Sequence, residues 1–435
     1  MDESALTAAP APAPASASRD GARAPHPAHG TVALVESPVQ LLNVLEWAHI
    51  QPGIPAARTP ASPGTPEDRA ARPPDGAAPP PGAAGSAGGG ASRAPGAAGA
   101  AGAPGAADGG ASAGGAGGGA NGRGRVPVTV VVLSPADPIS RGQLRRMAEL
   151  ARGEGIAVRW FEARGNRGGL LRTALALAPT LLRVRRLVIG DPFSRLVQVL
   201  LPLCRAKELT VVDDGTATME FTAILERGGR LVRWHRSGRR RSPVEAAFGV
   251  FASAARRRLT PGGRRRVELF SAMPATPPAG MALTVNTFSW TRGRFGPPRV
   301  LAGTDLIGTS LVETGVVDAE RYFAVVADLA ARHGAKRYFA HRKEAQEKLH
   351  RLAVETGLEI VRPDLPLELV ARRGPAGRVV LSFPSTVVHT LPLVLAGTGV
   401  DLRVVEVDPA WLTPGAGPRA HTFLAAISSA KSPAG

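Results

Sequence analysis

The sequence predicts a two-domain α/β protein built on parallel β-sheets. Short apolar runs alternate along the chain with stretches of helical periodicity, and this alternation occurs in two series. Such alternation is typical of parallel sheets wound by helices. Of the 435 residues, about 330 remain once segments of low complexity are set aside, enough for two ordinary cores.

The first series begins with the apolar run 31–35. Ser37 and Pro38 then mark a helix start, with Ser as the N-cap and Pro at the first helical position. Later elements are read from buried β-branched runs and helical spacing. The predicted strands are 128–133, 156–161, 186–189 and 209–212, and the predicted helices are 141–152, 170–182 and 194–204. Residues 216–266 show a helix and then an arginine-rich stretch, so we place the domain junction there and assign 30–266 to the N-terminal domain.

The second series, 267–435, is assigned to the C-terminal domain. Its predicted strands are 267–270, 300–302, 337–339, 358–361, 379–382 and 402–405, and its predicted helices are 318–332, 344–356, 366–372 and 386–396. The two series therefore predict two Rossmann-like domains that face a cleft, which is a GT-B-like architecture. Ligands of such sheets bind outside the carboxyl ends of the strands, so polar residues at those positions are the candidates for function.

Two segments, 1–29 and 52–125, are dominated by Ala, Gly, Pro and Ser. Such a composition cannot bury enough apolar surface to offset the entropy of ordering, so we expect a disordered N-terminal tail and a long disordered insert. Gly does not recur at every third position, which excludes a collagen helix. The insert interrupts the first domain in a helix-to-strand connection, where the fold tolerates it.

The net charge of +18 comes mostly from arginine, with runs at 239–241, 256–258 and 264–266. This charge suits nucleic acid, an anionic membrane surface, anionic substrates, or simply a solvated face. Aromatic residues make up only 4% of the chain, and no nucleic-acid-binding signature is present, so nucleic acid is disfavoured. The segment 236–266 is a candidate for peripheral contact with an anionic membrane.

Cys204 is the single cysteine, so an intramolecular disulfide and a thiolate metal site are excluded. The N-terminus lacks the pattern of a signal peptide, and no apolar run approaches the ~18 residues of a spanning helix. We therefore expect a cytoplasmic protein whose membrane contact, if any, is peripheral at the inner face.

The predicted strand 209–212 ends in Asp213-Asp214-Gly215. Gly permits a tight turn, and the two carboxylates point in different directions, so one can shape the turn while the other faces the cleft as a general base. The alternative is that both acids only cap the following helix.

The other domain supplies two candidate anion sites. His341 and Arg342 follow the predicted strand 337–339, where imidazole and guanidinium groups suit a phosphate; the alternative is an exposed loop. Ser385 and Thr386 open a predicted helix, where hydroxyl and backbone N–H groups can bind phosphate together. The alternative is ordinary helix capping.

In this order, these residues resemble the motifs of the bacterial sialyltransferases and polysialyltransferases: an acidic-acidic-Gly motif, a His-Pro motif and a Ser-Ser/Thr motif. Outside the insert, the resemblance runs from about residue 31 to the end. Four further segments are similar to the same group, namely Val35-Glu36-Ser37-Pro38-Val39-Gln40-Leu41-Leu42, Ile189-Gly190-Asp191, Ile307-Gly308-Thr309-Ser310 and Leu365-Pro366-Leu367-Glu368. The Pro that this motif has after the His is Arg342 here, and an arginine could bind the phosphate directly.

The resemblance implies an inverting enzyme that transfers a sialic acid or related nonulosonic acid from a CMP-sugar to a glycan hydroxyl. It implies Asp213 as the base, with Asp214 and Gly215 shaping the turn, and His341 as the group that assists departure of CMP. Ser385, Thr386, Gly308, Ser310 and Arg342 would bind the nucleotide, and Glu368 its ribose. No metal or other cofactor is implied, and the sequence shows no cluster with metal-ligand spacing. Two alternatives remain: an enzyme of this fold that uses another nucleotide sugar, and a non-catalytic basic binder of nucleic acid or another anionic polymer.

Overall fold

The computed structural model describes residues 30–51, 127–164, 168–233, 243–417 and 424. The expected disordered tail (1–29), the expected disordered insert (52–125) and the arginine run 239–241 lie outside the described residues. Among the residues that are described, no helix is both long enough and apolar enough to cross a membrane.

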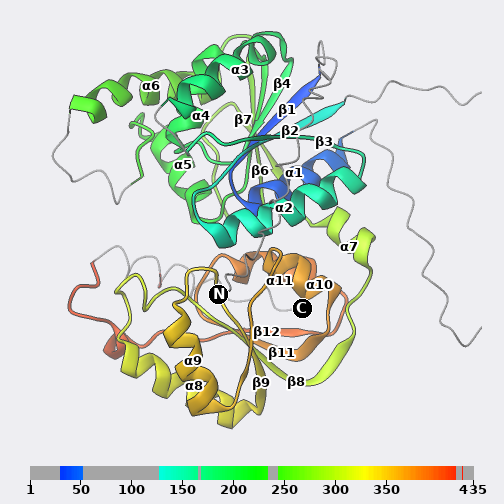
Figure 1. Cartoon of the computed structure of the whole chain (residues 1–435), viewed down its shortest axis with the longest axis vertical. Coiled ribbons are helices and arrows are strands. Elements are labelled where there is room, and N and C mark those ends of the chain that lie inside the picture. Colours follow the sequence, from blue (N-terminus) through cyan, green and yellow to red (C-terminus); the bar gives the residue numbers. More distant parts are fainter. Residues whose placement is uncertain (1–29, 52–126, 165–167, 234–242, 418–423, 425–435) are drawn as a thin grey trace, which may run out of the picture. The chain divides into compact units, whose positions relative to one another are not determined.

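The N-terminal sheet is parallel throughout, with strands in the order β3-β2-β1-β4-β5-β6-β7 (Figure 1). The strands are β1 (Thr31–Val35), β2 (Val128–Leu133), β3 (Ala157–Phe161), β4 (Arg186–Ile189), β5 (Glu208–Val212), β6 (Arg266–Ser271) and β7 (Met281–Val285). The central strands β1 and β2 are buried along their whole length, as their continuous apolar sequences predict.

Helices cover both faces of this sheet (Figure 1). One face carries α1 (Pro38–Ile50) and α2 (Pro138–Gly153); the other carries α3 (Gly169–Arg183), α4 (Arg195–Leu200), α5 (Thr216–Glu226) and α6 (Pro243–Leu259), with a short 3-10 turn, Leu201–Leu203, after α4. Local sequence sets the starts of α1 and α2. Ser37 and Asp137 each accept a hydrogen bond from a first-turn N–H, and a Pro follows each of them.

The C-terminal sheet is also parallel, with strands in the order β10-β9-β8-β11-β12. Its strands are β8 (Val300–Ile307), β9 (Ala335–Phe339), β10 (Glu359–Val361), β11 (Ala376–Ser382) and β12 (Asp401–Val404). Helices α8 (Ala319–His333) and α9 (Gln346–Thr356) cover one face, and α10 (Leu367–Arg373) and α11 (Val387–Val394) the other (Figure 1). The 3-10 turn Pro409–Trp411 follows β12.

Helix α7 (Ser289–Phe295) joins the two sheets and packs against α1 and α10. The buried carboxylate of Glu46 on α1 fixes its start, because it accepts hydrogen bonds from the N–H groups of Trp290 and Thr291, each at 2.9 Å. A single apolar cluster continues from α1 through Trp290 to Leu369 on α10 and Leu391 on α11. The helices between the sheets therefore share one core.

The predicted fold class is confirmed, since both halves are Rossmann-like sheets. Their strand orders reverse direction at β1/β4 and at β8/β11, and the crevice at such a switch point is where ligands of doubly wound sheets bind. The predicted junction at 266/267 is wrong. The strand at 267–270 exists, but as β6 it pairs with β5, and β7 follows it in the same sheet, so the junction lies beyond β7. The arginine run 256–258 forms the last turn of α6, and this helix packs onto the sheet through Ala255 and Leu259.

The connection from α1 to β2 is anchored at the amino edge of the N-terminal sheet. The Gln51 side chain accepts a hydrogen bond from Arg186, the first residue of β4, at 2.8 Å. The Pro127 carbonyl accepts one from Thr31 N–H, at the start of β1, at 3.1 Å. Thr31 and Arg186 are paired neighbours, so both anchors lie at the edge opposite the carboxyl ends of the strands.

Candidate active site

A pocket lies at the carboxyl ends of strands from both sheets. Its cavity volume is ≈ 220 Å³. The first domain contributes residues after β1 and β5, and the second contributes residues after β8, β9 and β11 and the start of α10. Nine of the predicted site residues line it, namely Asp213, Asp214, Gly215, Gly308, His341, Arg342, Glu368, Ser385 and Thr386; Ser310 does not.

Asp213 is built into the turn that follows β5. Its Oδ1 accepts hydrogen bonds from the Gly215 N–H at 3.0 Å and the Thr218 hydroxyl at 2.6 Å, and its Oδ2 accepts one from the Ala272 N–H at 3.2 Å. Asn43 donates to its backbone carbonyl at 2.9 Å. Burial raises the pKa of this carboxyl above its ordinary value. Asp213 thus has the geometry expected of a residue that holds the turn.

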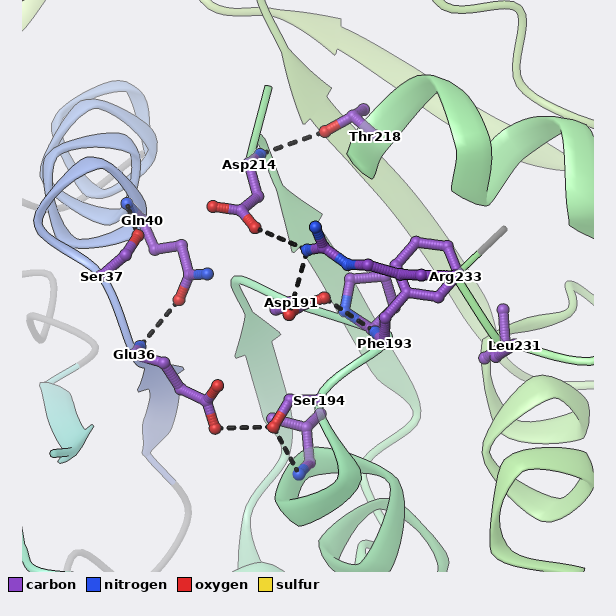
Figure 2. A network of polar contacts seen from close by, with 12 residues as sticks. Glu36, Ser37, Gln40, Asp191, Phe193, Ser194, Asp214, Thr218, Leu231 and Arg233 are labelled. Atoms are coloured by element: carbon purple, nitrogen blue, oxygen red, sulfur yellow. Dashed lines mark hydrogen bonds and ion pairs between the residues drawn. The ribbon is translucent and has the colours of Figure 1, made fainter. Parts of the chain in front are cut away.

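Asp214 lines the pocket and has a polar environment of its own (Figure 2). Its carboxylate lies 3.3 Å from Nη2 of Arg233, and the same nitrogen lies 3.2 Å from the carboxylate of Asp191. The pKa of Asp214 is raised to about 7, first by burial and then by the negative charge of Asp191; Arg233, Gln40 and Arg342 act in the opposite direction. A carboxyl group with a pKa near neutrality suits a general base.

Glu36, which follows β1, belongs to the same network of polar contacts (Figure 2). The Glu36 carboxylate accepts a hydrogen bond from the Ser194 hydroxyl at 2.6 Å and pairs with Arg164 at 2.6 Å. The Gln40 side chain accepts from the Glu36 N–H at 2.7 Å, and Gly190 leaves room for it, because a Cβ there would collide with that side chain. Asp191 thus places negative charge beside Asp214, while Gln40 links the Glu36 backbone to the same group, because its side chain also lowers the pKa of Asp214 by hydrogen bonding.

On the facing wall, His341 is held as a neutral hydrogen-bond donor. Its Nδ1 accepts a hydrogen bond from the Lys343 N–H at 3.2 Å, so a neutral ring carries its proton on Nε2. Burial lowers the pKa of His341 to about 4, and the nearby cations Arg342, Lys343 and Lys348 act in the same direction. Because the same cations attract phosphate, a bound phosphate would raise this pKa.

A buried network beneath this loop sets the position of His341. The Glu344 carboxylate accepts the His341 N–H and the Tyr338 hydroxyl, each at 2.5 Å, and pairs with Lys348 at 2.8 Å. A Cβ on Gly308 would collide with the Glu344 carboxylate and the Tyr338 hydroxyl. Only Gly fits at this point of the pocket wall, which is why the chain after β8 can lie against the network.

Ser385 and Thr386 lie between β11 and α11 and line the pocket. Thr386 makes no capping hydrogen bond with its side chain. The capping alternative is therefore not supported for Thr386. A Cβ on Gly215, which has φ +68°, would lie 3.0 Å from Cγ2 of Thr386, so the acidic turn and this hydroxyl pair are in direct apposition. Gly215 is needed both for its backbone conformation and for this approach.

Glu368 occupies the pocket wall at the start of α10. Its carboxylate accepts a hydrogen bond from the Thr390 hydroxyl at 2.8 Å, and burial raises its pKa. Arg342 is exposed at the same pocket. Among the described residues, no group of three or more His, Cys, Asp or Glu side chains is arranged to hold a metal ion.

Sequence reasoning missed Glu36, Asp191 and Arg233 as members of the site. For the two acids a usable signal existed, since each follows a predicted strand at its carboxyl end, as Asp213 does. For Arg233 no such signal existed, because it is one of many arginines and its partners Asp191 and Asp214 are 42 and 19 positions away.

Comparison with known proteins gives limited likenesses. No family description matches the chain, and no curated protein matches it. An α/β-galactoside α-2,3-sialyltransferase from Photobacterium phosphoreum is similar over 69% of this chain and 89% of its own, at 11% identity and a TM-score of 0.36. The E. coli heptosyltransferase WaaC is similar over 69% of this chain and 90% of its own, at 12% identity. Acinetobacter baumannii MurG is similar over 70% of this chain and 75% of its own, at 11% identity. Both have a TM-score of 0.32. Likenesses this distant carry no argument about the chemistry of this chain.

Proposed function

We propose that this protein is a glycosyltransferase that moves a sialic acid or related nonulosonic acid from a CMP-sugar donor to a hydroxyl of a glycan acceptor, with inversion. One observation carries the proposal. Asp214, a carboxyl group with a pKa near 7, lines one wall of the pocket, while His341, Ser385 and Thr386 line the other. A base opposite a set of phosphate-binding groups suits displacement of a nucleotide by a hydroxyl.

On the donor side, the nucleotide phosphate would lie between His341 and the hydroxyl pair. The Nε2–H of His341 donates to a phosphate oxygen, and the cation Arg342 stabilises negative charge as the glycosidic bond breaks. Ser385, Thr386 and the first N–H groups of α11 bind the remaining oxygens. The buried Glu368 carboxylate accepts hydrogen bonds from the ribose hydroxyls.

On the acceptor side, we propose Asp214 as the base in place of Asp213. The Asp213 oxygens already accept two backbone N–H groups and one hydroxyl, whereas the Asp214 carboxylate pairs with the guanidinium of Arg233 at 3.3 Å. Asp214 takes the proton of the acceptor hydroxyl as the oxygen attacks the anomeric carbon, and CMP leaves toward His341. Attack and departure on opposite faces of one carbon give inversion.

A nucleotide panel tests the donor. In thermal-shift measurements CMP should raise the unfolding temperature more than UMP or GMP, and no shift at millimolar CMP would end the CMP hypothesis. With Asp214→Asn, transfer should fall by about 10²- to 10⁴-fold while CMP binding stays close to wild type. Asp213→Asn should instead lower the unfolding temperature. If Asp213→Asn alone abolished transfer in a stable protein, the assignment of the base would revert to Asp213.

A second candidate is a transferase that uses a nucleoside-diphosphate sugar. Arg342 favours it, since a guanidinium stands at the pocket where the resembling family has Pro, and a second phosphate adds negative charge for it to bind. ADP, GDP or UDP would then shift the unfolding temperature more than CMP does. Arg342→Ala should abolish that preference.

A further inference from the structure

Helix α3 is apolar on both of its faces. Its inner face packs into the core of the N-terminal domain through Ala174, Leu177 and Leu181. Its outer face carries three large apolar side chains that are strongly exposed: Leu171 at 61%, Leu175 at 66% and Leu182 at 45%. A surface helix normally places polar residues outward, so three large apolar side chains exposed on one helix are expected to be covered by something.

The chain from α3 to the start of β5 carries mostly positive charge. From Gly168 to Lys207 the only acidic residue is Asp191, which lies at the active site and pairs with Arg233. Arg172 and Arg183 lie on the exposed side of α3 itself. The chain also brings the exposed residue Arg205 to the end of the helix, where its N–H donates to the carbonyl of Leu181 at 3.2 Å.

Helix α6 also combines exposed apolar side chains with arginines, and it lies in the same layer of helices. It packs against α4 and the turn Leu201–Leu203, and α3 contacts the same two elements. Both helices lie on the same face of the N-terminal sheet (Figure 1). On α6, Val250 is 67% exposed and Phe251 is 40% exposed, and Arg256 and Arg257 follow within two turns. Exposed apolar side chains next to arginines thus occur on two helices of one layer.

We propose that the outer faces of α3 and α6 form a docking surface for an anionic lipid bilayer. Leucines and Phe251 enter the boundary between headgroups and acyl chains, while the arginines bind lipid phosphates. Charge complementarity selects this occupant. A second copy of the chain would bring the same arginines against one another, whereas an anionic headgroup layer neutralises them. The proposal does not depend on the donor or on the reaction.

Cosedimentation of the full chain with vesicles tests the surface. The probes are vesicles of phosphatidylcholine alone and vesicles that also contain phosphatidylglycerol. The double variant Leu171→Asp/Leu175→Asp should lower binding to the mixed vesicles at least about tenfold, because two leucines that enter the bilayer are lost and two negative charges are added. Val354→Asp on α9 is the matched control. Val354 is 72% exposed but lies in the other domain, so this variant should bind like wild type.

The proposal predicts binding that requires phosphatidylglycerol and weakens as salt rises. Arg172→Glu/Arg183→Glu should remove the dependence on phosphatidylglycerol. Circular dichroism should be unchanged in all variants, because the substituted side chains are exposed. Equal binding by wild type and the leucine double variant would overturn the proposal. So would a dimer in light scattering that the same double variant dissociates, since a second copy would then cover the face.

Discussion

The pKa of Asp214 can be tested without knowledge of any substrate. Burial and the neighbouring Asp191 raise it from an ordinary value of 3.8 to about 7 in the folded protein. Each pH unit of difference corresponds to about 1.4 kcal/mol, so keeping Asp214 ionised at high pH lowers the free energy of unfolding by up to about 4 kcal/mol.

The sign of the effect follows from proton uptake. Between about pH 4 and pH 7 the folded protein retains a proton on Asp214 that the unfolded chain has released, so this group makes stability fall as pH rises. Asp214→Asn removes the effect. Urea unfolding at a series of pH values should therefore show the Asn variant gaining stability relative to wild type up to about pH 7, with a constant difference above it. A difference that is flat across this whole range would refute the raised pKa.

Two further variants separate the causes. The carboxylates of Asp191 and Asp214 lie 3.2 and 3.3 Å from one nitrogen of Arg233. The two oxygens are therefore at most 6.5 Å apart. At that distance like charges repel by about 2.5 kcal/mol at an effective dielectric constant of 20, equivalent to about two pH units. Asp191→Asn should move the upper end of the pH range over which stability changes to lower pH. Arg233→Met should move that upper end to higher pH. Shifts in the same direction would contradict the arrangement.

Three other predictions concern the facing wall. In NMR titrations His341 should stay neutral down to about pH 5, and inorganic phosphate should raise its pKa; a pKa near 6.5 in the free protein would contradict the burial argument. Gly308→Ala should destabilise the protein by about 1–3 kcal/mol in urea unfolding, since its Cβ presses on the Glu344 carboxylate; unchanged stability would show that the network can move. Ser385→Ala/Thr386→Val should weaken nucleotide binding about tenfold with little change in unfolding temperature, and a large loss of stability would indicate a structural role instead.

Much of the fold follows from local sequence. The central strands of a parallel sheet are buried on both faces, so β1 and β2 appear as unbroken apolar runs and were predicted closely. The edge strand β7 was not predicted, because it has one neighbour and only its first residue, Met281, is buried, so it is not a buried apolar run like the interior strands. Helix α7 was missed for a different reason: its start is fixed by Glu46, which is 244 positions from Trp290.

The site was predicted in outline by one geometric rule. Parallel strands bring their carboxyl ends to a common edge, and Asp213, His341 and Ser385, which this rule singled out, line one pocket. The division of labour between the two acids could not be predicted. It depends on which carboxylate meets Thr218 and the Ala272 N–H and which meets Arg233, and these partners come together only in the folded chain.

The anchoring of Gln51 and Pro127 at one edge of the sheet has a practical consequence for protein engineering. The chain leaves and re-enters the domain beside the paired residues Thr31 and Arg186, on the side away from Asp214. New chain ends opened there should leave the strand order intact, so a circular permutant is a reasonable design at this connection. A fluorescent reporter fused between the same two anchors would likewise leave the entrance to the pocket clear.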